Sequence, residues 1–508
     1  MKGIWVGLLA AALAAGCQKA VTATQAGHDD GSTPNQGAPP DPPPLVPPPP
    51  PPQPPPSPVV GSRLGAWGKV MKWPVVSIHS HVLPDGHVFT WGHSGDPTAW
   101  DPATGKFDPA PQPIDIFCGG HALLSDGRLL VTGGNISNDH GLPNANLFDY
   151  RTGEWTAGAQ MSRGRWYPTN TALPNGEMLV TAGDDENALP NPIPEVWQPD
   201  GTWRELSTAF RSMDYYPWMF VAPDGRVFYA GWQPTSAWLD TSGTGRWTTG
   251  PKHAVSLTRG YGTAAMYEPG KVLVAGGAQS PPVSSAEVID LNQPSPAWRV
   301  TQPMAHARHH AVATLLPDGK VLVTGGTSSP GNNDASGAVL EPELWDPATE
   351  RWTALAPMAV KRLYHSTALL LPDGRVFTGG GGQPYATGEP DHFDAQVFYP
   401  PYLFNQDGSA ADRPRIADAP VEIAYGESFA ISTPDAVSQV TLVKLGSMTH
   451  AFDQSQRFNR LSFTAGSNGV TATAPANANL APPGHYMLFL VGPNGAPSLS
   501  RIVHLSSP

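Results

Sequence analysis

Cysteine is nearly absent from this chain, since only Cys17 and Cys118 occur among its 508 residues. Cys17 lies in an apparent export leader, and thiols of exported proteins tend to oxidise. Cys118 then has no partner within the mature chain, which excludes a fold held together by disulfides. A buried cysteine is often no more than a small hydrophobic side chain. A single thiol in an exported protein therefore needs either that explanation or a chemical one.

Basic clusters and the common cofactor motifs are also missing. The net charge is −12 and only 14% of the residues are charged, which argues against a nucleic-acid binder. No G-x-G-x-x-G follows a predicted strand, and neither C-x-x-C nor H-E-x-x-H occurs. These absences exclude the nicotinamide, flavin and zinc enzymes that carry such motifs. No apolar run beyond the leader is long enough to span a membrane.

The first sixty residues predict export followed by a spacer. Residues 1–17 combine an early Lys, a short apolar run and small residues before Cys17, which is typical of a signal peptide. The ending "AAGC" resembles a bacterial lipobox, which would lipidate Cys17; ordinary cleavage nearby is the alternative. Residues 18–60 are proline-rich and predict an extended polyproline linker. We expect a protein that is lipid-anchored at the bacterial cell envelope or cell surface, or else secreted.

A repeat organises the middle of the chain. Each copy has a D-G, N-G or P-G turn between two apolar runs, a strong hairpin signal. The copies are "LPDGHVFTWG", "LSDGRLLVTGG", "LPNGEMLVTAG", "APDGRVFYAG", "EPGKVLVAGG", "LPDGKVLVTGG" and "LPDGRVFTGGG", spaced 41 to 55 residues apart. Paired glycines and a later Trp at this period resemble kelch repeats, each of which is one blade of a β-propeller.

These patterns predict an all-β protein of two folded domains. Residues 61–409 are expected to form a seven-bladed kelch-type β-propeller, with "GAWGKVMKWP" as an outer strand that closes the ring. Residues 410–508 show short alternating strands and are expected to form an immunoglobulin-like β-sandwich. No segment predicts a helix of any length.

The inner strands of the propeller place one residue of each repeat near a common axis. Counting back eight residues from each turn gives Cys118, Tyr167, Tyr216, Tyr261, His310 and His365. With regular strand alternation, these side chains share one face. Taken singly, each has an ordinary explanation: packing for the tyrosines, and loop hydrogen bonds for His309 and His310. The joint placement of a lone Cys, several Tyr and two His is what favours a functional site.

At this point the sequence resembles the radical-copper oxidases, the galactose oxidase and glyoxal oxidase family, over residues 61–508. Four motifs carry the resemblance: "FCGG" with Cys118, "RGRWYPTN" with Tyr167, "KRLYHSTALLLPDG" with Tyr364 and His365, and "LGSMTHAFDQSQR" with His450. The wording is closest to the glyoxal oxidase branch. His485, in "PPGHYMLF", is the competing histidine and is expected to be a surface or packing residue.

The resemblance implies a site and an activity. Tyr167, Tyr364, His365 and His450 would hold one copper ion, with Tyr364 also the general base. Cys118 would be joined to the Tyr167 ring by a thioether, and this pair would be the radical cofactor. Two imidazoles and two phenols suit Cu(II). The implied reaction oxidises small aldehydes, primary alcohols or α-hydroxy carbonyls with O2 and releases hydrogen peroxide.

One part of the family pattern is missing. In galactose oxidase, a Trp from the loop after the tyrosine strand covers the thioether, whereas here that stretch is "GDDENALPNPIPEVW". Trp166 is expected on the opposite strand face. Asp184, Asp185 and Glu186 at the mouth would repel acidic products or bind sugar hydroxyls, unless they belong to a solvated loop.

Two functions from different classes remain open at this stage. The first is the oxidase, with a small aldehyde, alcohol or glycan and O2 as partners, and a monomer with no membrane contact beyond a lipid on Cys17. The second is a non-catalytic kelch propeller that binds glycans or proteins at the cell surface. The combination of Cys118 with the four ligand residues favours the oxidase, because a binding module has no need of it.

Overall fold

The computed structural model describes residues 61–383 and 388–506, and in them the chain is all-β. The helical elements there are one four-residue helix, α1 (Gly61–Leu64), and the 3-10 turns η1 (Ala335–Gly337) and η2 (Pro401–Leu403). None of these helices is long and apolar enough to cross a membrane. The proposed leader and the proposed linker, residues 1–60, lie outside the described residues.

Five sequence repeats each form one antiparallel four-stranded sheet. The sheets are β7 (Gly120–Leu123), β8 (Leu129–Thr132), β11 (Ala145–Asp149) and β12 (Glu154–Ala157); β13 (Thr169–Ala172), β14 (Met178–Thr181), β15 (Glu195–Trp197) and β16 (Trp203–Glu205); β17 (Met219–Val221), β18 (Val227–Tyr229), β19 (Thr235–Asp240) and β20 (Arg246–Lys252); β21 (Thr263–Glu268), β22 (Lys271–Ala275), β23 (Ala286–Asp290) and β24 (Arg299–Thr301); and β25 (Val312–Leu315), β26 (Val321–Thr324), β27 (Glu343–Asp346) and β28 (Arg351–Ala354). A short ribbon of β9 (Asn135–Ser137) and β10 (His140–Gly141) accompanies the first of them.

The turns of these sheets follow the expected chemistry. In β7–β8, Leu124 and Arg128 pair across the turn, and Gly127 adopts φ +88°, a left-handed conformation that glycine reaches without strain. The Asp126 carboxylate accepts the backbone N–H and the Nε–H of Arg128, at 3.0 and 2.8 Å. The Asp-Gly-Arg sequence of the repeat therefore forms a hairpin whose turn is capped by its own Asp side chain.

The first and last repeats build larger sheets. The first contains β3 (His79–Val82), β4 (Val88–Trp91), β5 (Thr98–Trp100) and β6 (Phe107–Pro109). The last contains β29 (Ser366–Leu370), β30 (Val376–Gly380) and β31 (Asp394–Tyr399). The N-terminal strands β1 (Ala66–Trp67) and β2 (Met71–Lys72) both pair with β31. The start of the described chain thus adds outer strands to the sheet of the last repeat, as the sequence indicated.

Buried arginines fix the segments that precede four of the inner strands; they are Arg165, Arg259, Arg308 and Arg362. Arg308 is typical, since its guanidinium donates to the Gly325 carbonyl (3.0 Å) and to the Glu343 carboxylate (2.6 Å). A buried cation keeps its charge at acceptable cost only when paired and hydrogen-bonded in this way. This recurring ion pair was not predicted from the sequence.

Residues after 410 form two further sheets packed face to face. One has the order β32 (Glu422–Ile423), β41 (Arg501–Leu505), β40 (Gly484–Val491), β34 (Gln439–Lys444) and β37 (Phe458–Leu461). The other has β33 (Ser428–Ser432), β39 (Gly469–Thr473) and β38 (Phe463–Gly466). Ile431 and Val470 from one sheet and Leu442 and Leu488 from the other meet in a shared core. Alternation of buried and exposed residues in β33 and β39 matches a sandwich with one wet face.

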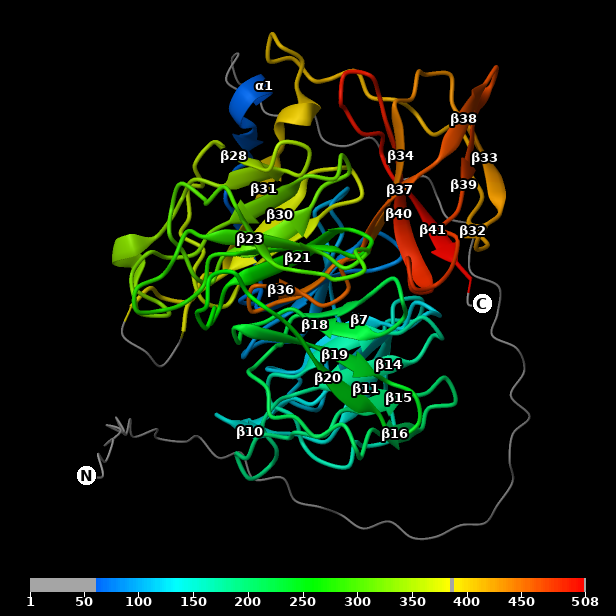
Figure 1. The fold of residues 1–508 in the computed structure, drawn as a ribbon. Coiled ribbons are helices and arrows are strands. Elements are labelled where there is room, and N and C mark those ends of the chain that lie inside the picture. The colour runs from blue at the N-terminus through cyan, green and yellow to red at the C-terminus, as the bar shows by residue number, and fades with distance from the viewer. Residues whose placement is uncertain (1–60, 384–387, 507–508) are drawn as a thin grey trace. The chain divides into compact units, whose positions relative to one another are not determined.

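A hairpin from this C-terminal region joins the first sheet. β35 (Ser447–Thr449) and β36 (Phe452–Asp453) pair with each other, and β35 pairs antiparallel with β3. The resulting sheet has six strands in the order β36-β35-β3-β4-β5-β6. In Figure 1, β36 accordingly lies among the repeat sheets, away from β34 and β40. This hairpin brings residue 450 to the inner ends of the repeat strands.

Candidate metal centre

Six residues at the equivalent repeat position share an unusual backbone conformation. Each has a positive φ: Cys118 66°, Tyr167 66°, Tyr216 44°, Tyr261 53°, His310 59° and His365 66°. Non-glycine residues rarely adopt this conformation, and it costs on the order of 1 kcal/mol or more each. They precede the inner strands rather than lie in them, so regular strand alternation does not apply. The equivalence predicted from the sequence is visible in the backbone, but its assumed cause was wrong.

The left-handed residue turns its side chain against that of the residue before it. The rings of Trp166 and Tyr167 stack at a centroid distance of 3.6 Å and an angle of 5°. Tyr364 and His365 stack in the same way, at 3.8 Å and 25°. The expectation that Trp166 faces away from Tyr167 is therefore wrong. Trp166, which is 6% exposed, covers one face of the Tyr167 ring.

His450 stands at the tip of the β35–β36 hairpin. It and Ala451 are the two turn residues, with φ values of 45° and 71°. Two consecutive positive φ values define the hairpin turn that normally takes Asn-Gly. A His-Ala pair in this turn is strained, and strain of this kind gathers at functional sites. The Thr449 hydroxyl and the His450 Nδ1 lie 2.7 Å apart and fix the ring.

Four side-chain donor atoms converge in the interior. The hydroxyl oxygens of Tyr167 and Tyr364 are 2.6 Å apart. Nε2 of His450 lies 2.9 Å from the Tyr167 hydroxyl. The His365 and His450 rings are 4.9 Å apart and nearly perpendicular, at 87°. All four side chains are at most 6% exposed. The structure therefore brings together Tyr167, Tyr364, His365 and His450.

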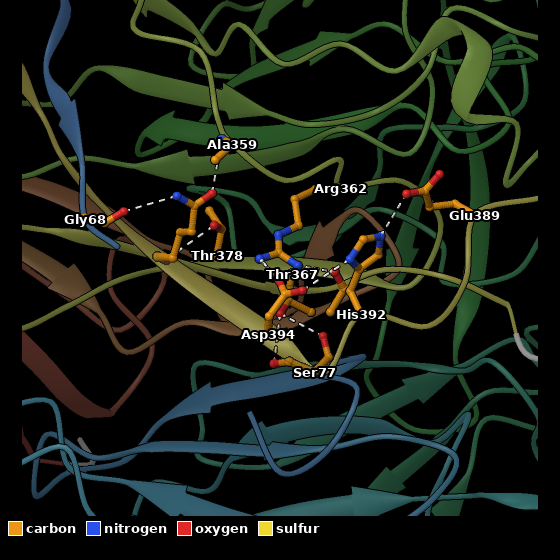
Figure 2. A network of polar contacts seen from close by, with 11 residues as sticks. Gly68, Ser77, Ala359, Arg362, Thr367, Thr378, Glu389, His392 and Asp394 are labelled. Atoms are coloured by element: carbon orange, nitrogen blue, oxygen red, sulfur yellow. Dashed lines mark hydrogen bonds and ion pairs between the residues drawn. The ribbon is translucent and has the colours of Figure 1, made fainter. Parts of the chain in front are cut away.

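His365 is held with one nitrogen uncommitted. Its Nδ1 lies 2.9 Å from the Gly382 carbonyl and so carries the proton, which leaves Nε2 buried without a partner. Figure 2 shows what anchors the chain on either side: Arg362 donates to Asp394 (2.6 Å), and Thr367 donates to the Ser77 carbonyl (3.0 Å). An unsatisfied buried nitrogen in a rigid segment is what a metal ligand looks like before metal binds.

Burial keeps the four groups neutral. It lowers the pKa of His365 to about 3 and that of His450 well below its ordinary value. It also raises the pKa of Tyr167 and of Tyr364 well above 10, with neighbouring tyrosines adding to the shift. The chain alone thus offers two neutral imidazoles and two protonated phenols.

This donor set fits a copper ion. Imidazole nitrogens with oxygen donors are ligands that Cu(II) accepts in tetragonal geometry. Loss of both phenol protons would neutralise a dication, so the buried site would carry no net charge. Among the described residues, no group of three or more His, Cys, Asp or Glu side chains is arranged to hold a metal. A metal here therefore depends on the phenols.

Cys118 is buried beside Tyr167. It is 1% exposed, unpaired, and packed in one cluster with Trp166, Tyr167 and Tyr216. Its backbone carbonyl accepts the N–H of Tyr167 at 2.8 Å, and its own N–H donates to Nε2 of His79 at 3.2 Å. Burial raises the pKa of the thiol. The thiol is held against the ring to which the resemblance joins it.

Asp184 and Asp185, in the segment that follows β14, make hydrogen bonds that stabilise the local structure. The Tyr215 hydroxyl donates to Asp184 at 2.5 Å, and Tyr215 also lies edge-on to Trp166. Asp185 accepts the backbone N–H groups of Asn187 and Leu189. Asp184 and Asp185 are 7% and 4% exposed, so a solvated loop does not describe them. They hold the Trp166 side of the site in place.

The competing histidines have hydrogen-bond or packing partners of their own, and among them the His310 ring also lies 4.9 Å from the ring of Tyr364. His310 is hydrogen-bonded to Asn332 and His309 to the Ser329 carbonyl, as the ordinary explanation required. His485 packs against His504, with ring centroids 4.7 Å apart. Trp166, stacked on Tyr167, is a candidate site residue that was not predicted from the sequence. The matching aromatic pairs in "RWYP" and "LYHS", at the same distance from the turn, were the signal.

The chain resembles known proteins along most of its length. Residues 90–402 match the family described as glyoxal oxidase N-terminus, and residues 413–505 match the galactose oxidase-like early set domain. A galactose oxidase of Gibberella zeae is 30% identical over 87% of this chain and 71% of its own length. The aldehyde oxidase GLOX of Vitis pseudoreticulata is 29% identical over 79% and 84% of the two chains. A solved fungal alcohol oxidase of the AA5 family, in complex with copper, superposes with a TM-score of 0.81 at 28% identity and covers 87% of this chain and all of its own.

Fold and sequence together define an all-β oxidoreductase with a C-terminal early set domain, of the kind that uses O2 as acceptor. The chain belongs to the galactose oxidase and glyoxal oxidase family.

Proposed function

We propose that this protein is a copper-radical oxidase that oxidises small aldehydes or primary alcohols and α-hydroxy carbonyls with O2. The observation that carries the proposal is the convergence of the Tyr167, Tyr364 and His450 donor atoms, with the orphan nitrogen of His365, beside the buried Cys118. No packing requirement explains two phenols and two neutral imidazoles around one point.

Tyr167, Tyr364, His365 and His450 would hold the copper. When bound, copper supplies a one-electron redox partner and an open position for the substrate oxygen. With copper bound and its own proton lost, the Tyr364 oxygen would take the proton of the substrate hydroxyl. The Tyr167 oxygen, deprotonated and oxidised by one electron, would take the hydrogen atom of the substrate C–H bond. Trp166 stacked on Tyr167 keeps water from that ring face.

Two electrons leave the substrate, so a second oxidising equivalent is needed beside the metal. We propose that it resides on Tyr167, joined through its ring to the Cys118 sulfur. Formation of this bond removes one hydrogen from the thiol and one from the ring, and O2 accepts both as H2O2 in the presence of copper. In turnover, an alcohol R-CH2OH and O2 give R-CHO and H2O2, and an aldehyde hydrate gives the acid and H2O2.

The substrate proposal favours aldehydes and α-hydroxy carbonyls over sugars. This preference is supported by the sequences of the motifs that contain Tyr167 and Tyr364 and by the glyoxal oxidase match over residues 90–402. The similar proteins are named for three different substrates, namely galactose, aldehyde and alcohol. The Asp184–Tyr215 pair at the mouth is a polar contact available to a hydrated aldehyde or a sugar hydroxyl alike.

We also propose a domain architecture and a cellular location for the protein. The seven sheets built from residues 66–399 and the β35–β36 hairpin are the blades of a kelch-type propeller within residues 61–409, and residues 410–508 form the immunoglobulin-like domain. Residues 1–17 direct export and residues 18–60 act as the spacer, with Cys17 as a lipid attachment site and the protein a monomer.

The test is hydrogen peroxide release by the purified protein loaded with Cu(II), over glyoxal-type aldehydes, primary alcohols and galactose. We expect peroxide in proportion to copper content, fastest with the small aldehydes. A copper-loaded protein that releases no peroxide with any of them would instead support a glycan- or protein-binding propeller. The comparisons do not favour that alternative.

A further inference from the structure

A second polar site lies between the repeat sheets and the segment that follows the β35–β36 hairpin. It is a small cavity of about 20 Å³. Its walls come from β13, β17, the end of β34 and residues 454–457. The polar side chains that line it are Thr171, Lys444, Gln454, Ser455, Gln456 and Arg457.

Three of these side chains present buried atoms with no hydrogen-bond partner. They are the Thr171 hydroxyl, the Gln454 Nε2 and the Ser455 hydroxyl, and their residues are 4%, 5% and 6% exposed. Such orphans are rare and costly in folded proteins. The orientation of the Gln454 amide is fixed, because its Oε1 accepts the backbone N–H groups of His121 (3.2 Å) and Asn170 (2.8 Å). Its Nε2 is therefore a committed donor with nothing to donate to.

The cavity also has two cations without a carboxylate partner. Within the described residues, neither Lys444 nor Arg457 has an acidic oxygen within 4.0 Å, and they are 5% and 4% exposed. Arg457 donates only to the Val221 carbonyl and the Met266 sulfur. Lys444 makes no hydrogen bond through its ammonium group, and the Tyr486 ring centroid lies 5.7 Å from it.

The nearby acid does not balance these cations. Asp453 accepts the backbone N–H groups of Ser447 and Ser455 and is half-buried. When Lys444, Arg457 and Asp453 are all ionised, two cations against one carboxylate leave the region with one positive charge. Burial lowers the pKa of Lys444 to about 7, and the nearby positive charge of Arg457 adds to the shift. The charged form of Lys444 is therefore destabilised when no anion is bound.

Charge and size together define the missing partner. A buried site with unpaired donors and one excess positive charge is satisfied by a monovalent anion. A volume of about 20 Å³ holds a particle close to the size of one water molecule. Sulfate, phosphate and carboxylates are larger than this, and a water molecule leaves the charge uncompensated.

We propose that this cavity binds a single halide ion, chloride in nature, through Lys444, Gln454, Ser455 and Thr171. The ion ties β13 to the segment that follows the hairpin bearing His450. Its expected effect is on how firmly that hairpin is docked against the repeat sheets. The proposal does not depend on the oxidase activity.

The test uses bromide as the probe, with the copper-loaded full-length protein. Crystals grown in sodium bromide should show an anomalous bromine peak in this cavity, separate from copper. In solution, saturating bromide should raise the melting temperature by roughly 2–4 °C over sodium gluconate at equal ionic strength. Lys444→Met should abolish both signals, whereas Lys271→Met, which removes a lysine paired with Glu268 at the surface, should keep both.

A second variant covers the case in which Lys444→Met does not fold. Gln454→Glu retains an oxygen for the two backbone N–H groups and places a fixed negative charge in the cavity. It should fold, show no bromine peak and lose the bromide-dependent rise. A water-like peak in bromide-grown wild-type crystals, or an equal rise in bromide and gluconate, would overturn the proposal.

Discussion

Two sets of three residues at equivalent repeat positions share a backbone conformation and differ in residue type. Cys118, Tyr167 and His365 and their counterparts Tyr216, Tyr261 and His310 occupy equivalent positions with the same left-handed backbone. All six lie at or beside the converging donor atoms, since the Tyr216 ring stacks on that of His450 at 4.7 Å and the His310 ring lies 4.9 Å from that of Tyr364. Of the second three, Tyr216 donates to the Gly119 carbonyl and His310 contacts Asn332. The repeat therefore supplies six copies of one geometry, and residue type decides which of them become a site.

The largest expected difference between the two sets comes from removing one tyrosine hydroxyl group from each. Tyr167→Phe should reduce oxidase turnover by about 10³-fold or more, because it deletes a metal ligand and the proposed hydrogen acceptor. Tyr216→Phe, the matched control, should cost about 1 kcal/mol of stability through its lost hydrogen bond and leave turnover within a few-fold. Peroxide release and chemical unfolding measure the two effects. Equal losses of turnover in both variants would contradict the division.

The histidines allow the same comparison for metal binding. His365→Gln should weaken copper binding by at least about 100-fold, since Nε2 of His365 is the uncommitted nitrogen. His310→Gln should bind copper as the wild type does. Competition with a chelator of known affinity measures both. Weaker binding in His310→Gln than in His365→Gln would place the metal elsewhere in the ring.

Trp166 tests whether stacking protects the site. Trp166→Leu opens one face of the Tyr167 ring, so we expect the initial rate to fall by roughly ten-fold or less and the enzyme to inactivate faster during turnover. Trp352→Leu, a half-buried outer-strand tryptophan on β28, is the control. Progress curves of peroxide release separate initial rate from inactivation. Wild-type inactivation kinetics in Trp166→Leu would show that the stacked ring is only packing.

Substitution of His81, a buried residue of β3, should give the smallest of these effects. Burial lowers the pKa of His81 to about 3, against about 6.5 when the chain is unfolded. Its neutral form thus adds stability that is complete above pH 6.5 and is lost as the pH falls toward 3. The slope is at most about 1.4 kcal/mol per pH unit. His81→Gln should remove up to one proton from the pH dependence of unfolding between pH 4 and 6.5, and the exposed His306→Gln should not.

The repeats and the candidate site residues could be predicted because each is marked by a short stretch of adjacent residues. The D-G turns cap themselves, so their hairpins follow from a few adjacent residues. The position of Trp166 did not follow, because it depends on a left-handed residue that strand rules do not foresee. The route of His450 did not follow either, because β35 pairs with β3, whose residues are more than 360 positions away. Pairing between strands so far apart cannot be predicted from neighbouring residues. His450 was identified only from the motif "SMTH" that contains it.

The cross-link between Cys118 and Tyr167 is the step on which the oxidase chemistry rests. Mass spectrometry of the purified protein, digested after exposure to Cu(II) and air, should find the Cys118 and Tyr167 peptides as one species lighter by two hydrogens. The copper-free protein should yield two separate peptides, with Cys118 open to alkylation after unfolding. A free, alkylatable Cys118 in the copper-loaded protein would contradict the proposed cofactor.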